Sequence, residues 1–273
     1  MCPYLVWQVC VCVCVCGPQV LQKVTKLCQD VLHRKMQEAA KRAVVVSVSS
    51  FEPGAPFAAR RGALRDAKRI HRILSQLDFK VDLHQDLDSR QIYSLFQKES
   101  RRPVAECFLA VLSSHGEDGY VFGADGRPVS LSRLFAFFDT ADMEQKVKVF
   151  LVQACRGGAM DDGVETDSGG VEETDLGGAY SQLSVPVNTL VMYATTPGYV
   201  AFMNPMGSVF LQTFCSLLEE EDHRRLELTR LMTRLSHRVA YTFQAKSHKF
   251  GPKKEMPCFL TRMTRDVFPF ASW

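Results

Sequence analysis

Residues 147–154 read Val-Lys-Val-Phe-Leu-Val-Gln-Ala, and residues 107–112, closer to the N-terminus, read Cys-Phe-Leu-Ala-Val-Leu. Both are short and almost continuously apolar, which is typical of strands buried on both faces of a sheet. Similar strands are predicted at 44–48, 79–83 and 189–194, and apolar residues at helical spacing lie between most of them. Strands that alternate with helices indicate an α/β fold with a mostly parallel sheet covered on both faces.

The other expected elements follow from apolar periodicity and turn residues. The sequence predicts helices at 64–77, from Asp88 or Ser89 through Phe96, from Ser130 to Phe138, from Ser208 through Leu218 and at 226–243, a hairpin at Asp125-Gly126, and a final strand at 256–263. The final strand is expected at an exposed edge of the sheet, which invites pairing with another copy of the chain. The C-terminal segment Phe268–Trp273 could instead mask that edge.

Composition excludes several classes of protein. The chain has 273 residues, of which 46% are hydrophobic, so it can form a sizeable core and is not disordered throughout. The formal net charge of +3 is too small for a nucleic-acid-binding surface, so no nucleic-acid partner is expected. Six of the ten cysteines lie in the first 28 residues, and the few in the rest of the chain indicate a reduced, cytoplasmic protein.

Residues 1–42 are expected to be a leader containing one helix, from Gln19 to Arg42. The alternating Val and Cys near its start form an apolar run too short to span a bilayer, so no membrane partner is expected. Residues 157–182 contain seven glycines, seven acidic residues and no lysine or arginine, which predicts a mobile loop. We therefore divide the chain into the leader 1–42, a larger part 43–158, an acidic linker 159–182 and a smaller part 183–273.

Two polar motifs follow predicted parallel strands, Ser113-Ser114-His115-Gly116 after one and Gln153-Ala154-Cys155-Arg156-Gly157 after another. Because parallel strands end at the same rim, His115 is suitably placed to take a proton from the Cys155 thiol. Gly116 has no Cβ, so its N–H group can approach an oxyanion, and the Cys155 N–H group is the second candidate donor. Taken alone, such a pair is more often a small core cysteine and a turn histidine.

The longer motifs favour the catalytic interpretation. Gln-Ala-Cys-Arg-Gly is the signature of the caspases, whose histidine lies about 50 residues upstream of the cysteine. In this chain the interval is forty residues, and a hairpin and loops between them absorb the difference. Further matches are Arg60–Ala67 (RRGALRDA), Tyr193–Phe202 (YATTPGYVAF) and Lys253–Thr264 (KKEMPCFLTRMT). From about Lys41 to Phe270 the chain resembles a caspase, and its short leader makes it similar to the executioner type.

The resemblance implies a three-layer α/β/α fold with a mostly parallel six-stranded sheet and one antiparallel edge strand. It also implies a thiol protease, a hydrolase that cleaves proteins after aspartate, with Cys155 as nucleophile and His115 as general acid and base. Gly116 with Cys155 would form the oxyanion hole, and Arg60 and Gln153 would bind the substrate aspartate. A guanidinium and an amide suit that task, because a buried carboxylate needs charge-assisted hydrogen bonds.

Two residues depart from the family pattern, one in the expected substrate-binding loop, which contains Phe202, Met203 and Asn204, and one nearby. The family has an arginine where this chain has Met203, and the executioner type has a large aromatic residue where it has Val209. Loss of one charge-assisted hydrogen bond is worth about 1.5–3 kcal/mol, or roughly 10- to 150-fold in transition-state binding. Specificity is therefore expected to differ from that of the executioner type.

Regulation is also implied by the resemblance. The linker repeats Glu-Thr-Asp, so Asp167 and Asp175 resemble processing sites of a zymogen, although a solvated acidic loop would look similar. The resemblance implies a role in apoptosis or related signalling, an upstream caspase as activator, and a homodimer through the C-terminal edge strand. The other histidines lack ligand spacing, so neither a metal nor a cofactor is expected. The alternative is a weakly active or inactive homologue that acts as a dimerisation or regulatory partner.

Overall fold

The computed structural model describes residues 39–160, 184–247 and 251–271, and the statements below concern these ranges. The chain divides into two units, Met1–Ala39 and Ala40–Trp273, and the elements described belong to the second. The expected leader helix and the processing sites Asp167 and Asp175 therefore lie outside the described residues, apart from the C-terminal end of the predicted helix.

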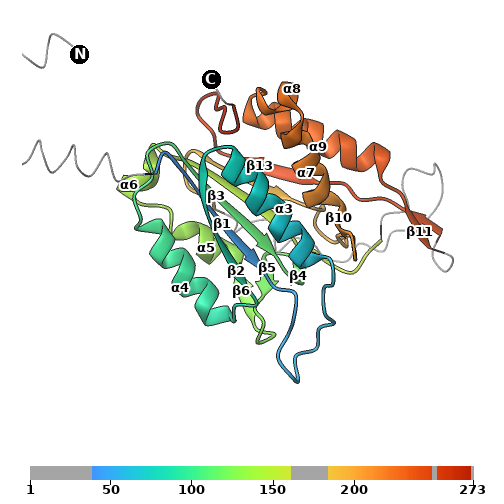
Figure 1. Cartoon of the computed structure of the whole chain (residues 1–273). Helices are drawn as coiled ribbons and strands as arrows, with labels where there is room; N and C mark the ends of the chain where they lie inside the picture. The colour runs from blue at the N-terminus through green and yellow to red at the C-terminus, as the bar shows by residue number, and fades with distance from the viewer. Residues whose placement is uncertain (1–38, 161–183, 248–250, 272–273) are drawn as a thin grey trace, which may run out of the picture. The chain divides into compact units, whose positions relative to one another are not determined.

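A six-stranded sheet forms the centre of this unit (Figure 1). Its strands lie in the order β13 (Cys258–Thr261), β8 (Thr189–Tyr193), β7 (Val147–Gln153), β3 (Cys107–Ser113), β1 (Lys41–Ser47) and β2 (Phe79–Gln85). The five strands from β8 to β2 are parallel, and β13 is antiparallel to β8. The predicted six-stranded α/β fold with one antiparallel edge strand is confirmed.

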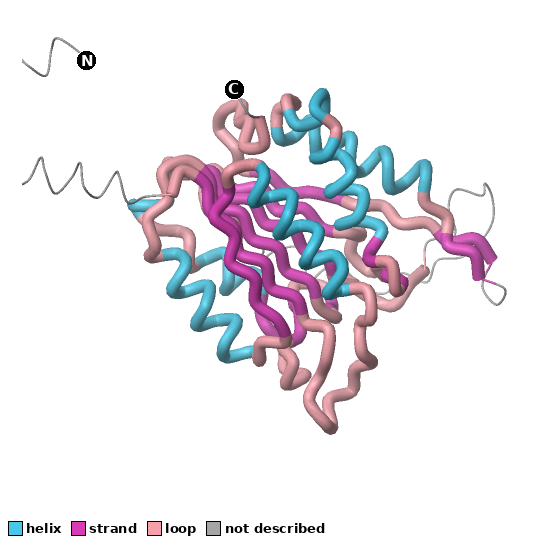
Figure 2. The backbone as a smooth tube through the Cα atoms, in the orientation of Figure 1, coloured by secondary structure: helices cyan, strands magenta, loops and turns pink. Residues whose placement is uncertain are grey.

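Helices cover both faces of the sheet, and Figure 2 shows α3 crossing in front of the strands. One face packs on α3 (Ala63–Gln76), α7 (Val209–Glu219) and α9 (Leu228–Thr242), and the other on α4 (Ser89–Ser100), α5 (Leu131–Ala136) and α6 (Ala141–Glu144). Successive β1 residues alternate between the two cores because side chains of a strand point to opposite faces. The remaining short helix of the described ranges, α8, is Glu221–Arg224.

Three helices begin at side-chain caps that the sequence predicts. Asp88 is the cap of α4, where its carboxylate accepts from the Gln91 N–H group and the Gln91 side chain accepts from the Asp88 N–H group. Ser130 caps α5 and Ser208 caps α7 through their hydroxyl oxygens. Helix α5 ends at Ala136, two residues before the predicted end.

The predicted continuation of the leader helix to Arg42 is wrong. Residues 41 and 42 already belong to β1, and the Arg42 guanidinium is buried in an ion pair with Glu99 of α4. The sequence suggested a basic, solvated helix end, but the charge is instead satisfied by a partner 57 residues away.

Several short strands escaped prediction. They form the pair β9 (Met203–Asn204) and β10 (Gly207–Ser208), the pair β11 (Ala245–Ser247) and β12 (Gly251–Lys253), and the three-stranded sheet of β4 (Gly116–Glu117), β5 (Tyr120–Phe122) and β6 (Pro128–Ser130). Elements of two or three residues have no measurable period. The turn between β5 and β6 contains the expected Asp125-Gly126 pair, with Gly126 at a φ of 71°.

The final strand lies at the edge of the sheet, as expected. Within the described ranges β13 pairs only with β8, and the exposed fraction of Leu260 in it is 38%. Phe270 of the C-terminal segment does not cover β13, because its ring packs against Phe79 of β2 and Phe214 of α7.

Candidate active site

The register of the sheet aligns the ends of three parallel strands. Ser47 of β1 pairs with Ser113 of β3, and Ser113 pairs with Gln153 of β7. His115 and Cys155 each lie two residues beyond this row. The parallel register therefore brings the two motifs to the same rim, as the sequence predicts.

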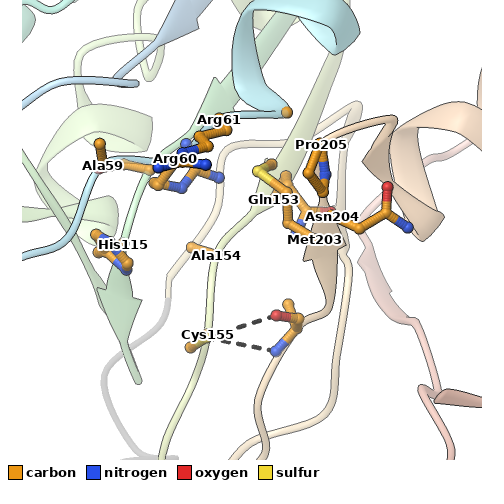
Figure 3. Close-up of a pocket in the computed structure, with 13 residues that line it drawn as sticks. Ala59, Arg60, Arg61, His115, Gln153, Ala154, Cys155, Met203, Asn204 and Pro205 are labelled. Carbon is orange, nitrogen blue, oxygen red and sulfur yellow. Dashed lines mark hydrogen bonds between the residues drawn. The ribbon is translucent and has the colours of Figure 1, made fainter. Parts of the chain in front are cut away.

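At this rim is a pocket of about 350 Å³, shown in Figure 3. Its walls include His115, Cys155, Arg60, Gln153, Met203 and Asn204, six of the eight residues predicted for catalysis and substrate binding. They come from the loop before α3, the ends of β3 and β7, and the β9 strand. Phe202 is not part of the wall, because its ring packs against Phe243, 5.2 Å away between centroids.

Gly116 also lies outside the pocket wall but packs closely against Ala154 and the Cys155 carbonyl oxygen. A Cβ atom at this position would be 2.7 Å from the Ala154 Cβ atom, 2.8 Å from the Tyr120 carbonyl oxygen and 2.9 Å from the Cys155 carbonyl oxygen. Only glycine permits so close an approach between β4 and the end of β7. Close packing therefore requires glycine here for a reason other than the predicted one, and the oxyanion role of the Gly116 N–H group stays a prediction.

The imidazole of His115 is held by the loop between β1 and α3. Its Nε2 atom lies 2.9 Å from the Ala58 carbonyl oxygen. A carbonyl oxygen only accepts, so this hydrogen bond requires the proton on Nε2 and leaves Nδ1 unprotonated. Burial lowers the pKa of His115 and the charge of Arg60 lowers it further, while the hydrogen bond to Ala58 acts in the opposite direction. A neutral imidazole of this tautomer can accept a proton at Nδ1.

The Cys155 sulfur contacts the segment before β9. The Ala201 N–H group donates to Sγ at 3.4 Å, and the thiol lies 3.8 Å from the Ala201 carbonyl oxygen. No hydrogen bond joins the side chains of Cys155 and His115 in the described structure. The thiol must turn from Ala201 towards the imidazole before it can transfer its proton.

Arg60 and Gln153 form a polar wall of the same pocket. The Arg60 guanidinium donates to the Val48 carbonyl oxygen at 2.7 Å and to the Ser113 hydroxyl at 3.0 Å. Burial lowers its pKa to about 10, against the opposite effect of Asp66 and Cys155. In the described ranges no carboxylate forms an ion pair with Arg60, so the charge is available to an acidic ligand.

Gln153 is 1% exposed, and its Oε1 atom is buried without a hydrogen-bond partner among the described residues. An unpaired buried amide oxygen is unusual in a folded protein. The Gln153 side-chain NH2 group and the Arg60 guanidinium both carry hydrogen-bond donors, so this wall can donate to a carboxylate, and the predicted role of the pair stays a prediction.

The β9–β10 hairpin is anchored to α3. The Asp66 carboxylate accepts from the Ser208 N–H group at 2.8 Å and from the Gln212 side chain at 2.6 Å. Burial raises the Asp66 pKa, and these hydrogen bonds oppose that rise. The chain at Gly62, next to Arg60, also approaches the Asn204 carbonyl oxygen closely. Met203 is half-buried in the pocket wall at the position of the missing family arginine.

Two groups that position this site were missed from the sequence. One is the Ala58 carbonyl oxygen, which has no sequence signal because every residue carries a carbonyl group. The other is Glu255, 1% exposed, which accepts from the Phe202 N–H group at 2.5 Å. Burial raises the Glu255 pKa to about 8. It lies within the KKEMPC motif, where it looks like one more charge on a solvated loop.

Neither a metal-binding cluster nor a membrane-spanning helix is present among the described residues. They contain no group of three or more His, Cys, Asp or Glu side chains placed to hold a metal ion. No helix in the described ranges has both the length and the apolar character needed to cross a membrane.

A mostly parallel sheet with a thiol and an imidazole at one rim defines a class of cysteine peptidase folds, and comparison with known proteins identifies the family. The caspase domain profile matches residues 40–268. The chain is 32% identical to caspase-7 of Gallus gallus over 237 residues, which cover 83% of this chain and 76% of that protein. It is 33% identical to caspase-3 of Bos taurus and 34% identical to caspase-3 of Felis catus, each over 82% of both chains. The chain belongs to the caspase family.

Proposed function

We propose that this protein is a cysteine endopeptidase that cleaves protein substrates after aspartate. The observation that carries the proposal is the single pocket in which His115, Cys155, Arg60 and Gln153 meet. A nucleophile, a base and a carboxylate-binding wall are the parts that such a hydrolysis needs. The relatives named caspase-3 and caspase-7 support it.

In the proposed reaction the Cys155 thiol gives its proton to Nδ1 of His115, and the sulfur attacks the carbonyl carbon of the scissile peptide bond. The N–H groups of Gly116 and Cys155 are proposed to stabilise the oxyanion. His115 then returns the proton to the leaving amine as the C–N bond breaks. Water, deprotonated by His115, hydrolyses the thioester and regenerates the thiol.

The substrate aspartate is proposed to enter between Arg60 and Gln153. Its carboxylate would pair with the buried guanidinium and accept from the Gln153 amide. Charge-assisted hydrogen bonds are about twice as strong as neutral ones, so an asparagine at this position would bind much more weakly. Met203 and Asn204 are proposed to line the path of the substrate chain.

The proposed regulation begins in the linker. We propose that the protein is made as a zymogen and is cut after Asp167 or Asp175, either by itself or by an upstream caspase. Asp167 is the better site because the small Ser168 follows it. Ala159, at the start of the linker, is hydrogen-bonded to Gly198 and Val200, so cleavage would loosen the segment that contains Ala201 and free the thiol to turn.

Two further parts of the proposal concern dimerisation and the cellular role of the protein. The exposed edge of β13 is proposed to pair with the same strand of a second copy, because such an isologous contact gives a closed dimer. Sedimentation velocity checks it, since a protein that stays monomeric at tens of micromolar would exclude this dimer. A cytoplasmic role in apoptosis or related proteolytic signalling follows the family resemblance.

The test is hydrolysis of fluorogenic peptides ending in aspartate by purified, linker-cleaved protein. Wild type is expected to release the fluorophore, Cys155→Ala to release none, and a matched peptide ending in asparagine to be a poor substrate. Hydrolysis that survives in Cys155→Ala would exclude this nucleophile. Equal rates on both peptides would exclude the aspartate pocket.

A separate test concerns the processing site. Asp167→Ala is expected to slow cleavage of the linker, and an intact Asp167–Ser168 bond in active enzyme would overturn that site.

Met203 favours a second candidate, a weakly active or inactive homologue that works by dimerising with other caspases. An apolar side chain in the wall of a carboxylate pocket removes one charge-assisted hydrogen bond, worth roughly 10- to 150-fold. Met203→Arg is therefore expected to raise kcat/KM by a factor in this range, and Met203→Leu serves as its matched control. Activity seen only in Met203→Arg would support the regulatory candidate, whereas measurable wild-type activity would support the enzyme.

A further inference from the structure

Two aromatic rings lie against the His115 imidazole. The Phe57 ring stacks on it, with centroids 5.0 Å apart and planes inclined by 19°. The Phe51 ring lies 5.2 Å from it at 39°, and Phe51 and Phe57 contact each other at 5.2 Å. Both rings come from the loop between β1 and α3, which also supplies the Ala58 carbonyl oxygen. The loop contains no helix or strand, so these ring contacts and the Ala58 carbonyl oxygen are what hold the imidazole in place.

A further ring contacts Phe57 without contacting the imidazole. Phe122 of β5 lies 4.5 Å from Phe57, and Phe122 makes no described ring contact with His115. Phe57 therefore contacts both the imidazole and, through Phe122, the small β4–β6 sheet. Packed aromatic rings have few rotamers, so a histidine stacked on such a ring loses its own freedom to turn.

The stack and the hydrogen bond act on the imidazole together. The hydrogen bond to Ala58 fixes Nε2, but a single hydrogen bond still allows the ring plane to rotate about it. The Phe57 face removes that rotation, so that Nδ1 keeps one direction. We propose that Phe57, assisted by Phe51, is a positioning residue for His115 and holds its unprotonated nitrogen towards the pocket. This inference rests on the proposed function, because it assigns His115 the part of general base.

The charged and titratable groups around the imidazole are few. Arg60 and Arg61 of the same loop and the Cys155 thiol at the end of β7 line the pocket that His115 enters. Arg60 opposes protonation of the imidazole, and burial acts in the same direction on its pKa. Phe57 contributes to that burial because its face cannot hydrogen-bond as water does. Removing the ring should therefore raise the pKa of His115 towards its ordinary value.

The test compares Phe57→Leu, which removes the stack but keeps an apolar side chain, with Phe57→Tyr, which keeps the ring. Phe122→Leu is the matched control, because it disturbs the packing of the loop and leaves the imidazole contact in place. Phe57→Leu is expected to lower kcat about 2- to 10-fold with KM unchanged. The acid limb of its pH profile should move to higher pH, and Phe57→Tyr should restore both. Phe122→Leu should lower the unfolding temperature and leave the acid limb in place.

Two readouts separate this inference from the proposed function. The NMR titration of the His115 ring and the pH dependence of Cys155 alkylation by iodoacetamide need no peptide substrate. If wild type fails to hydrolyse peptides, yet Phe57→Leu raises the His115 pKa and Phe122→Leu does not, the positioning role stands and the peptidase proposal falls. An unchanged titration and an unchanged alkylation profile in folded Phe57→Leu would overturn the positioning role, whatever the peptidase activity.

Discussion

Gly62→Ala tests how closely the loop before α3 approaches the β9–β10 hairpin. Gly62 has a φ of −86° and a ψ of −14°, which any residue adopts, so backbone freedom does not explain a glycine here. Contact does explain it. A Cβ atom would lie 2.1 Å from the Asn204 carbonyl oxygen and 2.9 Å from the Gly207 nitrogen. Since both are backbone atoms, one of the two segments must move by about 1 Å to restore ordinary contact.

A displacement of this size should affect catalysis more than stability. Overpacking costs about 1–3 kcal/mol, and a 1 Å misplacement of substrate-binding groups costs up to about 100-fold in rate. We expect kcat/KM of Gly62→Ala on an aspartate-ended peptide to fall 10- to 100-fold, with a small decrease in unfolding temperature. Gly158→Ala is the matched control, because a Cβ there meets nothing within 4 Å. If kcat/KM of Gly62→Ala equals that of the wild type, the close approach is refuted. If Gly158→Ala loses as much kcat/KM as Gly62→Ala, the loss cannot be assigned to the contact at Gly62.

Two further predictions concern buried titratable groups. Burial raises the Glu255 pKa to about 8, so between pH 4.5 and 8 the unfolded carboxyl ionises while the folded one stays protonated, and the free energy of unfolding falls as pH rises. Glu255→Gln should therefore gain unfolding temperature over wild type as the pH increases from 5 to 8, and a constant difference across that range would contradict the buried carboxyl. Burial also raises the pKa of Cys107 and Cys215 to about 12, so at pH 8 only about one thiol in ten thousand is ionised. Iodoacetamide mapping by mass spectrometry should find Cys155 labelled before either, and faster labelling of Cys107 would contradict its burial.

The parts of the site carried by long parallel strands could be predicted from the sequence. Apolar runs located β3 and β7 to within one residue, and parallel pairing then required that His115 and Cys155 share a rim. Arg60 was identified through its match to the family motif and not through any period. The match located it beside Gly62, whose close contact with Asn204 fits that assignment.

Other parts could not be predicted, for reasons that differ. The Ala58 carbonyl oxygen is a backbone atom, so no residue type in the sequence indicates that it binds His115. Phe57 was an ordinary loop aromatic until the fold brought it against His115, 58 residues along the chain. The prediction that the leader helix ends at Arg42 was wrong because the burial of the Arg42 charge depends on Glu99. A partner so distant in the sequence cannot be inferred from local periodicity.

The charge of Arg60, which forms no ion pair in the described residues, favours an acidic ligand in the pocket. Arg60 is 8% exposed, so its guanidinium loses most of its hydration. Its two hydrogen-bond partners, the Val48 carbonyl and the Ser113 hydroxyl, are both neutral. Its lowered pKa is the sign of that unfavourable state. A substrate carboxylate beside Arg60 would return the missing countercharge, so binding relieves a destabilisation already present in the free protein. An uncharged side chain of equal shape offers no such relief, so the proposed selection for aspartate would follow from the burial of Arg60 as much as from the contacts made.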